Sequence, residues 1–252
     1  MTRGGEKYDV IVIGSGPAGQ KGAIQAAKAG CRVAMVEQAG DVGGECVRRG
    51  TIPSKSLRET AIQYLNLKRN SDWLEMQMPD AVPVAGLINR LHHVVGSHVV
   101  TMQDQLRRNG VVLHHGKGRL ISPRQVEVLS LAGEKTTLSA EILLLATGSR
   151  PRQPPELPLD HEHVLDSDSI LSMAYLPSSL TVLGAGVIAC EYASSFAHLG
   201  VEVTIIDRGP RLVGVLDDQA ALAGGEAVGL HDEREAEGCF LHEGTGVVDR
   251  AA

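Results

Sequence analysis

The first forty residues of the chain alternate between short apolar runs and a longer segment rich in alanine. Residues 8–14 and 32–36 are apolar and β-branched, which predicts two buried strands. Residues 17–29 lie between them and predict a helix, because alanine is frequent there and Gly30 follows as a stop signal. A strand, a helix and a second strand within about thirty residues predict a parallel pair of strands.

The same order of segments returns near the end of the chain. Residues 180–186 and 201–207 predict two further strands, and residues 187–200 predict the helix that joins them. We interpret this recurrence as an internal repeat of one strand–helix–strand unit. Two such units in one chain favour an α/β fold built on parallel sheets.

The residues between the two units predict helices and a small meander. The expected elements are a helix at 54–70 with Ser54 as its N-cap, a helix at 84–109, a strand pair or one bent strand at 111–121, a hairpin formed by 126–131 and 136–140, and a buried strand at 141–148. A proline-rich stretch at 150–160 predicts a linker or domain edge. After residue 219 the chain is acidic and lacks apolar periodicity, so we expect a poorly ordered tail without further strands.

Composition narrows the classes of function. The chain has 252 residues and a formal charge of −6, which argues against a dedicated nucleic-acid binder, because such proteins carry a basic excess. No apolar run approaches the ~20 residues that cross a bilayer, and the first residues lack the apolar segment of a signal peptide. Four cysteines without a short Cys-x-x-Cys spacing do not indicate a disulfide framework. We therefore expect a cytoplasmic protein with neither membrane nor nucleic-acid partners.

Three histidine pairs raise the question of a metal site. They are His92 with His93, His114 with His115, and His161 with His163. Cysteine or carboxylate ligands at a suitable spacing do not accompany them, so we expect solvated or packed histidines and no metal.

A glycine-rich turn joins the first strand to the first helix and has the spacing of a dinucleotide-binding loop. The turn consists of Gly14, Ser15, Gly16, Pro17, Ala18 and Gly19. Gly14 permits the tight turn, Gly16 allows a pyrophosphate to approach the backbone, and Gly19 allows the helix to pack against the strand. The helix N-terminus presents N–H groups to the phosphates. Glu37 ends the next strand, 18 residues after Gly19, where a carboxylate accepts the ribose hydroxyls.

The second unit repeats this arrangement with alanine at the third glycine position. Its expected binding residues are Gly184, Gly186, Val187, Ile188, Asp207 and Arg208. Asp207 ends the second strand of the unit and favours the free 2′-hydroxyl of NAD, whereas Arg208 could bind the 2′-phosphate of NADP. The sequence leaves this choice open. Two fingerprints predict two dinucleotides, typically a flavin and a nicotinamide.

A third motif, GGECVRRGTIPSK, follows the first unit and carries a resemblance to a known family. It resembles the flavin-dependent pyridine nucleotide–disulfide oxidoreductases, whose motif GG-x-C-(four residues)-C-x-P-S-K places a redox disulfide beside the flavin. Gly43, Gly44 and Cys46 match this motif, but Thr51 stands at the position of the second cysteine. A threonine hydroxyl cannot form a disulfide, so the usual dithiol–disulfide exchange is not expected. A structural interpretation of Cys46, as a small buried apolar side chain, stays open.

The resemblance covers residues 7–218 and points to the transhydrogenase branch of the family. The lone cysteine before TIPSK, the segment 166–173 and the segment 184–194 look like this branch. The resemblance implies that Lys55 lies near the reactive edge of the flavin and pairs with Glu191. A buried pair of this kind would keep the ammonium charged and stabilise negative charge on reduced flavin. The resemblance further implies flavin contacts from Gly43, Gly44, Cys46, Thr51, Lys55, Gly118, Ala146, Thr147 and Gly148, with Cys46, Lys55 and Glu191 as catalytic residues.

The resemblance also implies a domain order. We expect a Rossmann-like FAD-binding domain with a parallel sheet and a small β-meander at 1–150, a partial Rossmann-like NAD(P)-binding domain at 151–218, and a divergent, disordered tail at 219–252. The expected function is FAD-dependent hydride transfer between NADPH or NADH and NAD(P)⁺, with nicotinamide nucleotides as partners.

Two alternatives to this function stay open. One is a reductase similar to dihydrolipoamide dehydrogenase, against which Thr51 argues. The other is a truncated flavin-binding module without turnover, because members of the family are nearly twice as long. Full-length members can form homo-oligomers, but their dimer surface lies beyond the resemblance, so no oligomeric state is predicted.

Overall fold

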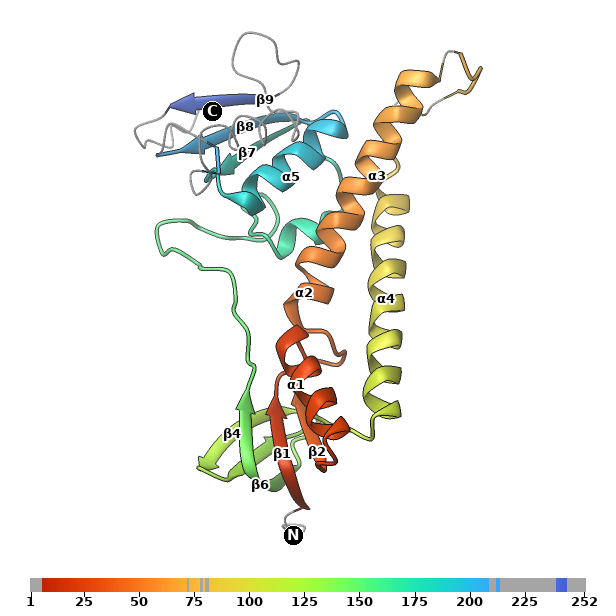
Figure 1. Ribbon diagram of the computed structural model, residues 1–252. Helices are drawn as coiled ribbons and strands as arrows, with labels where there is room; N and C mark the ends of the chain where they lie inside the picture. The colour runs from red at the N-terminus through yellow and green to blue at the C-terminus, as the bar shows by residue number, and fades with distance from the viewer. Residues whose placement is uncertain are drawn as a thin grey trace. The chain divides into compact units, whose positions relative to one another are not determined.

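The computed structural model describes residues 6–71, 73–77, 79, 82–208 and 212–213, together with the backbone of 239–243. The chain divides into two compact units, and each unit is formed by two segments. Unit 1 comprises residues 1–53 and 92–159, and unit 2 comprises residues 54–91 and 160–252. Two helices, α3 (Thr51–Asn70) and α4 (Val84–Arg108), each begin in one unit and end in the other (Figure 1).

Unit 1 contains a mixed six-stranded sheet in the order β3-β2-β1-β6-β5-β4. The strands are β1 (Glu6–Ile13), β2 (Val33–Glu37), β3 (Val112–His115), β4 (Lys117–Ser122), β5 (Gln125–Leu129) and β6 (Lys135–Leu145). Strands β3, β2, β1 and β6 run parallel to their neighbours, whereas β4, β5 and β6 form an antiparallel meander. The expected combination of a parallel sheet and a meander is therefore present.

Strand β6 joins two strands that the sequence predicts separately. The sequence predicts separate strands at 136–140 and 141–148, but the structure joins them into one strand of 11 residues. The first part of β6 pairs with β5, while Leu138 to Leu145 pair with β1. Neither glycine nor proline lies between the two halves, so no local signal ends the strand there.

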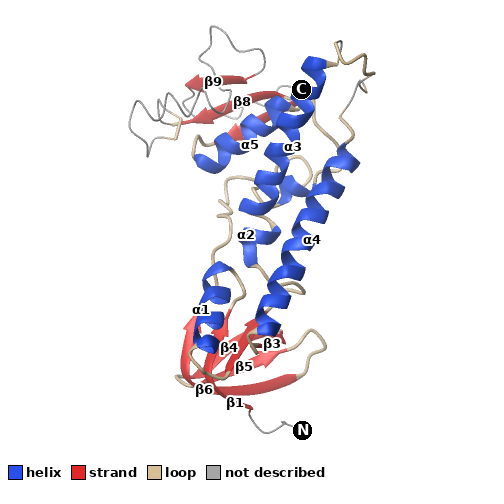
Figure 2. Cartoon of the chain, turned by 45° about the vertical axis from the view of Figure 1, so that its right-hand side comes forward, coloured by secondary structure: helices blue, strands red, loops and turns tan. Residues whose placement is uncertain are grey.

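Two apolar cores hold this sheet in place. On one face, Val12 and Met35 pack against helix α1 (Pro17–Lys28) and against Leu106 of α4; Figure 2 shows α1 alongside the strands. On the other face, Ile11 packs against Leu138 and the meander. All five of these side chains are almost completely buried, and burial of each such aliphatic group contributes about 1.5–3 kcal/mol. The cores thus fix the carboxyl ends of β1 and β2, where the glycine-rich turn begins.

Unit 2 repeats the strand–helix–strand arrangement on a smaller scale. Its parallel sheet has the order β7-β8-β9, formed by β7 (Ser179–Leu183), β8 (Glu202–Asp207) and β9 (Cys239–Glu243). Helix α5 (Val187–His198) packs on β7 and β8, and its Phe196 shares a core with Leu57 of α3 and Leu87 of α4. The sequence predicts no strand in the tail, so β9 differs from that expectation. The rest of the tail from residue 219 lies outside the described residues.

Two short helical segments and an early start of α3 complete the secondary structure of the described residues. Helix α2 covers Gly44–Arg48, and a 3-10 turn covers Ser169–Ser172. The sequence predicts Ser54 as the N-cap of the next helix, but α3 begins three residues earlier, at Thr51. Pro53 fits there because a proline in the first turn lacks only an N–H that would have no helical partner. Within the described ranges, none of the helices combines the length and apolar character that a membrane crossing requires.

Candidate functional site

In the glycine-rich turn of unit 1, neighbouring backbone segments approach one another closely. Gly14 has a φ of +103°, and a Cβ atom placed on it would lie 2.2 Å from the carbonyl oxygen of Ala146. A Cβ on Gly19 would lie 1.9 Å from the carbonyl oxygen of Gly14. Strand β1, helix α1 and the residue after β6 therefore meet in a space that admits no side chain at either position.

The start of α1 fits the pyrophosphate of a dinucleotide. Gly16 is the N-cap of α1, no described side chain caps the helix, and its first turn has no acidic residue. A Cβ on Gly16 would approach only the Cα of Gly44, at 3.9 Å, whereas a Cβ on Gly44 would lie 2.7 Å from the Cα of Gly16. The backbone of Gly16 and Gly44 thus lies beside the N–H groups at the start of α1, which no described side chain caps. Such an arrangement binds phosphates. The predicted neighbours Pro17 and Ala18 are exposed in this turn.

Glu37 lies beside this turn and is held by three hydrogen bonds. Its Oε2 accepts from the Ser15 N–H at 2.9 Å and from the Ser15 hydroxyl at 2.6 Å, and its Oε1 accepts from the Ala39 N–H at 2.9 Å. Burial alone would raise the pKa of Glu37, but these bonds and the nearby Arg48 charge together lower the pKa below its ordinary value. A carboxylate has about four acceptor positions, so the ionised Glu37 can still accept a ribose hydroxyl.

Ser15 also joins the turn to the third motif. The Gly43 N–H donates to the Ser15 hydroxyl oxygen at 3.0 Å, and it contacts the Ser15 carbonyl oxygen at 3.2 Å. Gly118 on β4 lies against the same strand ends, because a Cβ placed on it would be 3.2 Å from Val36 and 3.5 Å from Ile13. The structure therefore brings Gly43, Gly44 and Gly118 next to the turn, as well as Ala146. Thr147 and Gly148 follow Ala146 and are exposed.

Helix α2 holds two charged residues that the sequence analysis did not single out. Arg48 donates to Glu45 Oε1 at 3.3 Å, and its charge contributes to the low pKa of Glu37. Glu45 Oε2 is buried and has no hydrogen-bond partner among the described residues. The pair of arginines at 48 and 49, between Cys46 and Thr51, is the signal in the sequence that could have drawn attention to Arg48. Cys46 itself is half-buried and not part of a disulfide, and Thr51 opens α3 as an exposed residue.

The turn of unit 2 repeats the hydrogen bond from a backbone N–H to the strand-end carboxylate in more open surroundings. The Gly184 N–H donates to the Ile206 carbonyl at 2.7 Å, and the Ala185 N–H donates to Asp207 Oδ2 at 2.8 Å. A Cβ on Gly184 or on Gly186 would meet no atom of the described residues within 4 Å. The predicted binding residues Val187, Ile188 and Arg208 are exposed. The turn thus presents its carboxylate and helix N-terminus without the enclosure seen in unit 1.

Lys55 and Glu191 form the predicted ion pair, within unit 2. Lys55 Nζ lies 2.7 Å from Glu191 Oε1, and the Ser54 hydroxyl donates to the same oxygen at 3.1 Å. A buried pair is expected from the sequence, but 62% of the Lys55 side chain is exposed. Water screens such a pair, so its contribution to stability is about 0–1 kcal/mol. Ser54 is a residue whose role the sequence analysis misplaced, since its hydroxyl positions Glu191 instead of capping α3.

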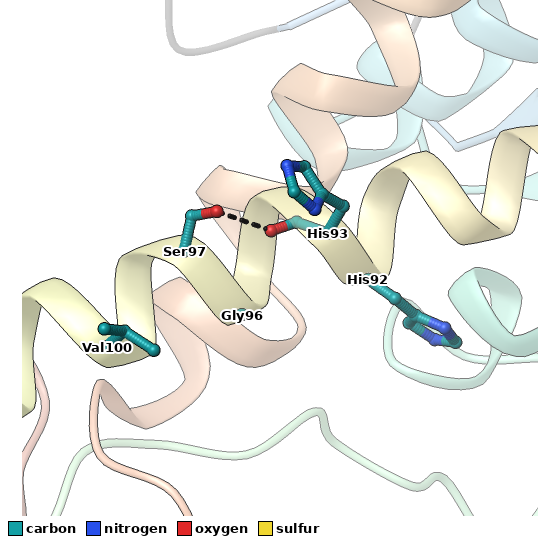
Figure 3. Close-up of a pocket in the computed structure, with 5 residues that line it drawn as sticks. All are labelled: His92, His93, Gly96, Ser97 and Val100. Carbon is teal, nitrogen blue, oxygen red and sulfur yellow. Dashed lines mark hydrogen bonds between the residues drawn. The ribbon is translucent and has the colours of Figure 1, made fainter.

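A hollow on α4 contains one of the three histidine pairs. His92, His93, Gly96, Ser97 and Val100 line this hollow, and all come from one helix. Figure 3 shows the imidazole rings of His92 and His93 pointing away from one another, while the Ser97 hydroxyl donates to the His93 carbonyl at 2.9 Å. Among the residues that the structure describes, no three histidine, cysteine or carboxylate groups are close enough to hold a metal ion.

Comparison with known sequences gives a family match over most of the chain. The pyridine nucleotide-disulphide oxidoreductase family matches residues 8–228. The soluble pyridine nucleotide transhydrogenase of Mycobacterium tuberculosis is 43% identical over 219 residues, which cover 86% of this chain and 47% of that protein. The enzyme of the same name from Pseudomonas putida is 40% identical over 216 residues, with the same coverage. The chain therefore spans about half the length of the curated relatives it matches.

Comparison with solved structures also gives a match to about half of a longer protein. A Cu(II) complex of the HOCl-induced flavoprotein disulfide reductase RclA from Escherichia coli superposes with a TM-score of 0.76 at 25% identity. The match covers 95% of this chain and 50% of that protein. Both units are thus arranged internally as in a flavoprotein reductase about twice as long.

Proposed function

The chain belongs to the pyridine nucleotide-disulphide oxidoreductase family, and from that premise we propose that it is an FAD-dependent oxidoreductase of the transhydrogenase type. It would transfer hydride between NADPH or NADH and NAD(P)⁺. The observation that carries this proposal is the pair of turns in which a strand-end carboxylate accepts a backbone N–H, Ser15 to Glu37 at 2.9 Å and Ala185 to Asp207 at 2.8 Å. Two such turns in one chain suit a reaction that needs two dinucleotides.

The first turn is the proposed FAD site and the second the proposed NAD(P) site. Bound flavin supplies the chemistry, because its ring system accepts and donates hydride. In unit 1, the α1 N-terminus and the backbone of Gly16 would hold the pyrophosphate, and Glu37 would accept the ribose hydroxyls. In unit 2, Gly186 and Asp207 would take the same roles for the nicotinamide nucleotide, with Arg208 available for a 2′-phosphate.

Thr51 favours hydride transfer over disulfide reduction, and Lys55 with its partners suits the flavin chemistry of either reaction. Thr51 stands where a disulfide reductase of this family carries its second cysteine, so no redox disulfide with Cys46 can form. Lys55 would place a positive charge near the flavin, where it stabilises negative charge in the reduced state. Glu191 and Ser54 orient Lys55 for this role through the shared contact at Glu191 Oε1.

A spectroscopic experiment tests the proposal. The purified chain is incubated with FAD, freed of excess cofactor, and titrated with NADPH without oxygen. We expect flavin absorbance that NADPH bleaches, followed by transfer from NADPH to a thio analogue of NAD. A chain that retains no FAD contradicts the proposal. A chain that retains FAD but reduces only dihydrolipoamide-type disulfides favours the reductase alternative.

Matched valine variants separate the two proposed sites. Gly16→Val should abolish FAD retention, because the new side chain would occupy the position where the pyrophosphate approaches the backbone. Gly186→Val should leave FAD retention intact and abolish bleaching by NADPH. Both variants should fold, since Cβ atoms at these positions meet none of the described atoms closer than 3.9 Å. Equal loss of FAD in the two variants would contradict the assignment of FAD to unit 1.

A further inference from the structure

Arg48 and Glu45 of α2 form an ion pair that the proposed function does not use. Arg48 Nη2 lies 3.3 Å from Glu45 Oε1, and Arg48 Nε donates to the Gly44 carbonyl at 3.3 Å. Only 25% of the Arg48 side chain is exposed. Arginine is rarely withdrawn from water to this extent without partners for its charge, so the surroundings of the pair indicate what it does.

The pair lies beside the glycine-rich turn of unit 1. Gly44, whose carbonyl accepts from Arg48, borders the start of α1, because a Cβ placed on Gly44 would lie 2.7 Å from the Cα of Gly16. The positive charge of Arg48 also helps to lower the pKa of Glu37, the carboxylate that ends β2. The charge of Arg48 therefore acts on the same turn whose backbone suits a pyrophosphate.

The contact between Arg48 and Glu45 leaves both partners incompletely bonded. Charge-assisted hydrogen bonds of arginine are typically about 2.7–2.9 Å long and often bidentate, whereas this pair has a single contact at 3.3 Å. Glu45 Oε2 is buried and has no hydrogen-bond partner among the described residues. A guanidinium group has several N–H donors, and the contacts to Glu45 and Gly44 engage one on Nη2 and one on Nε. Arg48 thus keeps donors for a further acceptor.

A purely structural role does not account for this arrangement. Ion pairs between neighbouring turns of a helix contribute little to stability, and they do so as exposed, freely adjusting side chains. A buried carboxylate oxygen without a partner instead costs free energy. Such a cost is understandable where the pair adjoins a binding site, because a charged ligand then changes the balance between the two side chains.

We propose that Arg48 is a further phosphate-binding residue of the first turn, which donates to the pyrophosphate of FAD beside the N–H groups of α1, and that Glu45 competes with the phosphate for it. This rests on the proposed function, in which FAD occupies unit 1. A planar guanidinium matches the oxygen atoms of a phosphate group and can bind two of them at once. In the free chain Glu45 holds Arg48 beside the turn, and the arriving phosphate takes over the guanidinium.

Two neighbouring arginines provide a matched test. The dissociation constant of FAD is measured by flavin fluorescence for the parent, Arg48→Met and Arg49→Met. Both variants remove one positive charge, but Arg49 is exposed and is not bonded to Gly44. We expect Arg48→Met to weaken FAD binding about tenfold or more, because a charge-assisted contact is lost, and Arg49→Met to change it less than about twofold. Arg48→Lys keeps the charge but not the planar fork, so it should fall between the parent and Arg48→Met.

ADP and salt show whether Arg48 acts on the phosphates. ADP shares the pyrophosphate with FAD but lacks the flavin, and its competition with FAD reports on the same site. The loss caused by Arg48→Met should be equal, within about twofold, for FAD and for ADP. Raising the salt concentration from about 0.05 to about 0.5 M should weaken FAD binding by the parent more than by Arg48→Met, because salt screens the attraction that the variant lacks.

Glu45→Gln tests the competition from the opposite direction. It removes a negative charge beside the phosphates and releases Arg48, so FAD should bind about threefold or more tightly. Glu59→Gln removes the same charge from an exposed position on α3 and should leave the affinity unchanged. Equal affinities of the parent and Arg48→Met would overturn the inference while leaving the proposed function intact. So would equal losses in the two arginine variants, a loss for FAD but not for ADP, or weaker binding by Glu45→Gln. A parent chain that binds no FAD would overturn the proposed function and this inference together.

Discussion

Two strand–helix–strand segments, β1-α1-β2 and β7-α5-β8, repeat the same backbone hydrogen bonds. Equivalent residues in the two segments differ in number by 170. Gly14 donates to the Val36 carbonyl at 2.8 Å, and Gly184 donates to the Ile206 carbonyl at 2.7 Å. The similarity extends past the second strand, because Gly43 donates to the Ser15 carbonyl and Val213 donates to the Ala185 carbonyl. Each of these contacts lies within one strand–helix–strand segment or joins it to the loop that follows.

The two units differ in what encloses the turn. In unit 1 the third position of the motif is Gly19, and a methyl group there would collide with the Gly14 oxygen at 1.9 Å. In unit 2 the equivalent residue is Ala189, whose methyl group is accommodated. Helix α1 thus packs against a turn that β6 closes from the other side, whereas the described residues place no such strand beside the turn at α5. The hydrogen-bonded turn is a local property, but its enclosure depends on a strand that is distant in sequence.

The largest expected effect comes from alanine at the first glycine of each turn. Both residues have φ near +100°, which costs an alanine about 1–2 kcal/mol in either unit. Only Gly14→Ala adds a collision with the Ala146 backbone, so it should lose about 4 kcal/mol in total. Gly184→Ala should lose about 1–2 kcal/mol. Urea unfolding followed by circular dichroism measures both. Equal losses would show that β6 does not confine the first turn.

The third motif position gives the next largest difference. Gly19→Ala places a methyl group against the Gly14 carbonyl and should lower the free energy of unfolding by about 3 kcal/mol. The reverse change in unit 2, Ala189→Gly, should cost about 1 kcal/mol through helix propensity alone. The same unfolding measurement applies. A mild effect of Gly19→Ala would mean that α1 can shift away from the turn to make room for the methyl group, as the position of Ala189 in α5 already does.

Local sequence predicted the two strand–helix–strand segments and the long helix well. The helix expected at 84–109 is present at Val84–Arg108, and both carboxylates stand at the strand ends where the spacing placed them. Periodicity, glycine stops and β-branched runs act within a few residues of one another, so they can be recognised without knowledge of the fold.

Features that depend on distant partners were less predictable. Ser54 has the character of an N-cap, but Glu191, 137 residues away, takes its hydroxyl. The sequence at 136–148 indicated two strands, and only pairing with β1 and β5 together explains the single strand β6. The exposure of Lys55 likewise depends on what packs around it, which no pattern along the chain encodes.

Replacing each strand-end carboxylate by its amide measures how much the charge contributes to stability in the two turns. Glu37→Gln weakens bonds from Ser15 and Ala39 to a buried charge and should cost about 2 kcal/mol at pH 7. Asp207→Asn, at a half-buried group, should cost about 1 kcal/mol. Because the folded-state pKa of Glu37 lies below the ordinary value of 4.5, its contribution is complete above that pH and is lost as the pH falls through the folded-state pKa.

Unfolding measured at pH 7 and at pH 3 checks this expectation. The difference between the parent and Glu37→Gln should narrow at the lower pH, because below 4.5 the unfolded chain takes up a proton at Glu37 and the charged form then contributes less to stability. A difference that stays constant between the two pH values would mean that the carboxylate charge contributes nothing and that only the shape of the side chain is needed.

The smallest effect on stability is expected at Lys55, where the two units carry different residues at equivalent helix positions. Glu191 of α5 corresponds to Lys21 of α1, so only the second unit has a carboxylate to pair with Lys55. Lys55→Met should change the free energy of unfolding by about 0.5 kcal/mol, since water screens the exposed ammonium. The proposed role predicts a larger functional effect: flavin reduction by NADPH should slow about tenfold or more, corresponding to about 1.4 kcal/mol at the transition state. Lys55→Arg retains the charge and should recover most of the rate. A loss of 2 kcal/mol or more in stability, with unchanged reduction kinetics, would instead make the ion pair a structural contact of unit 2.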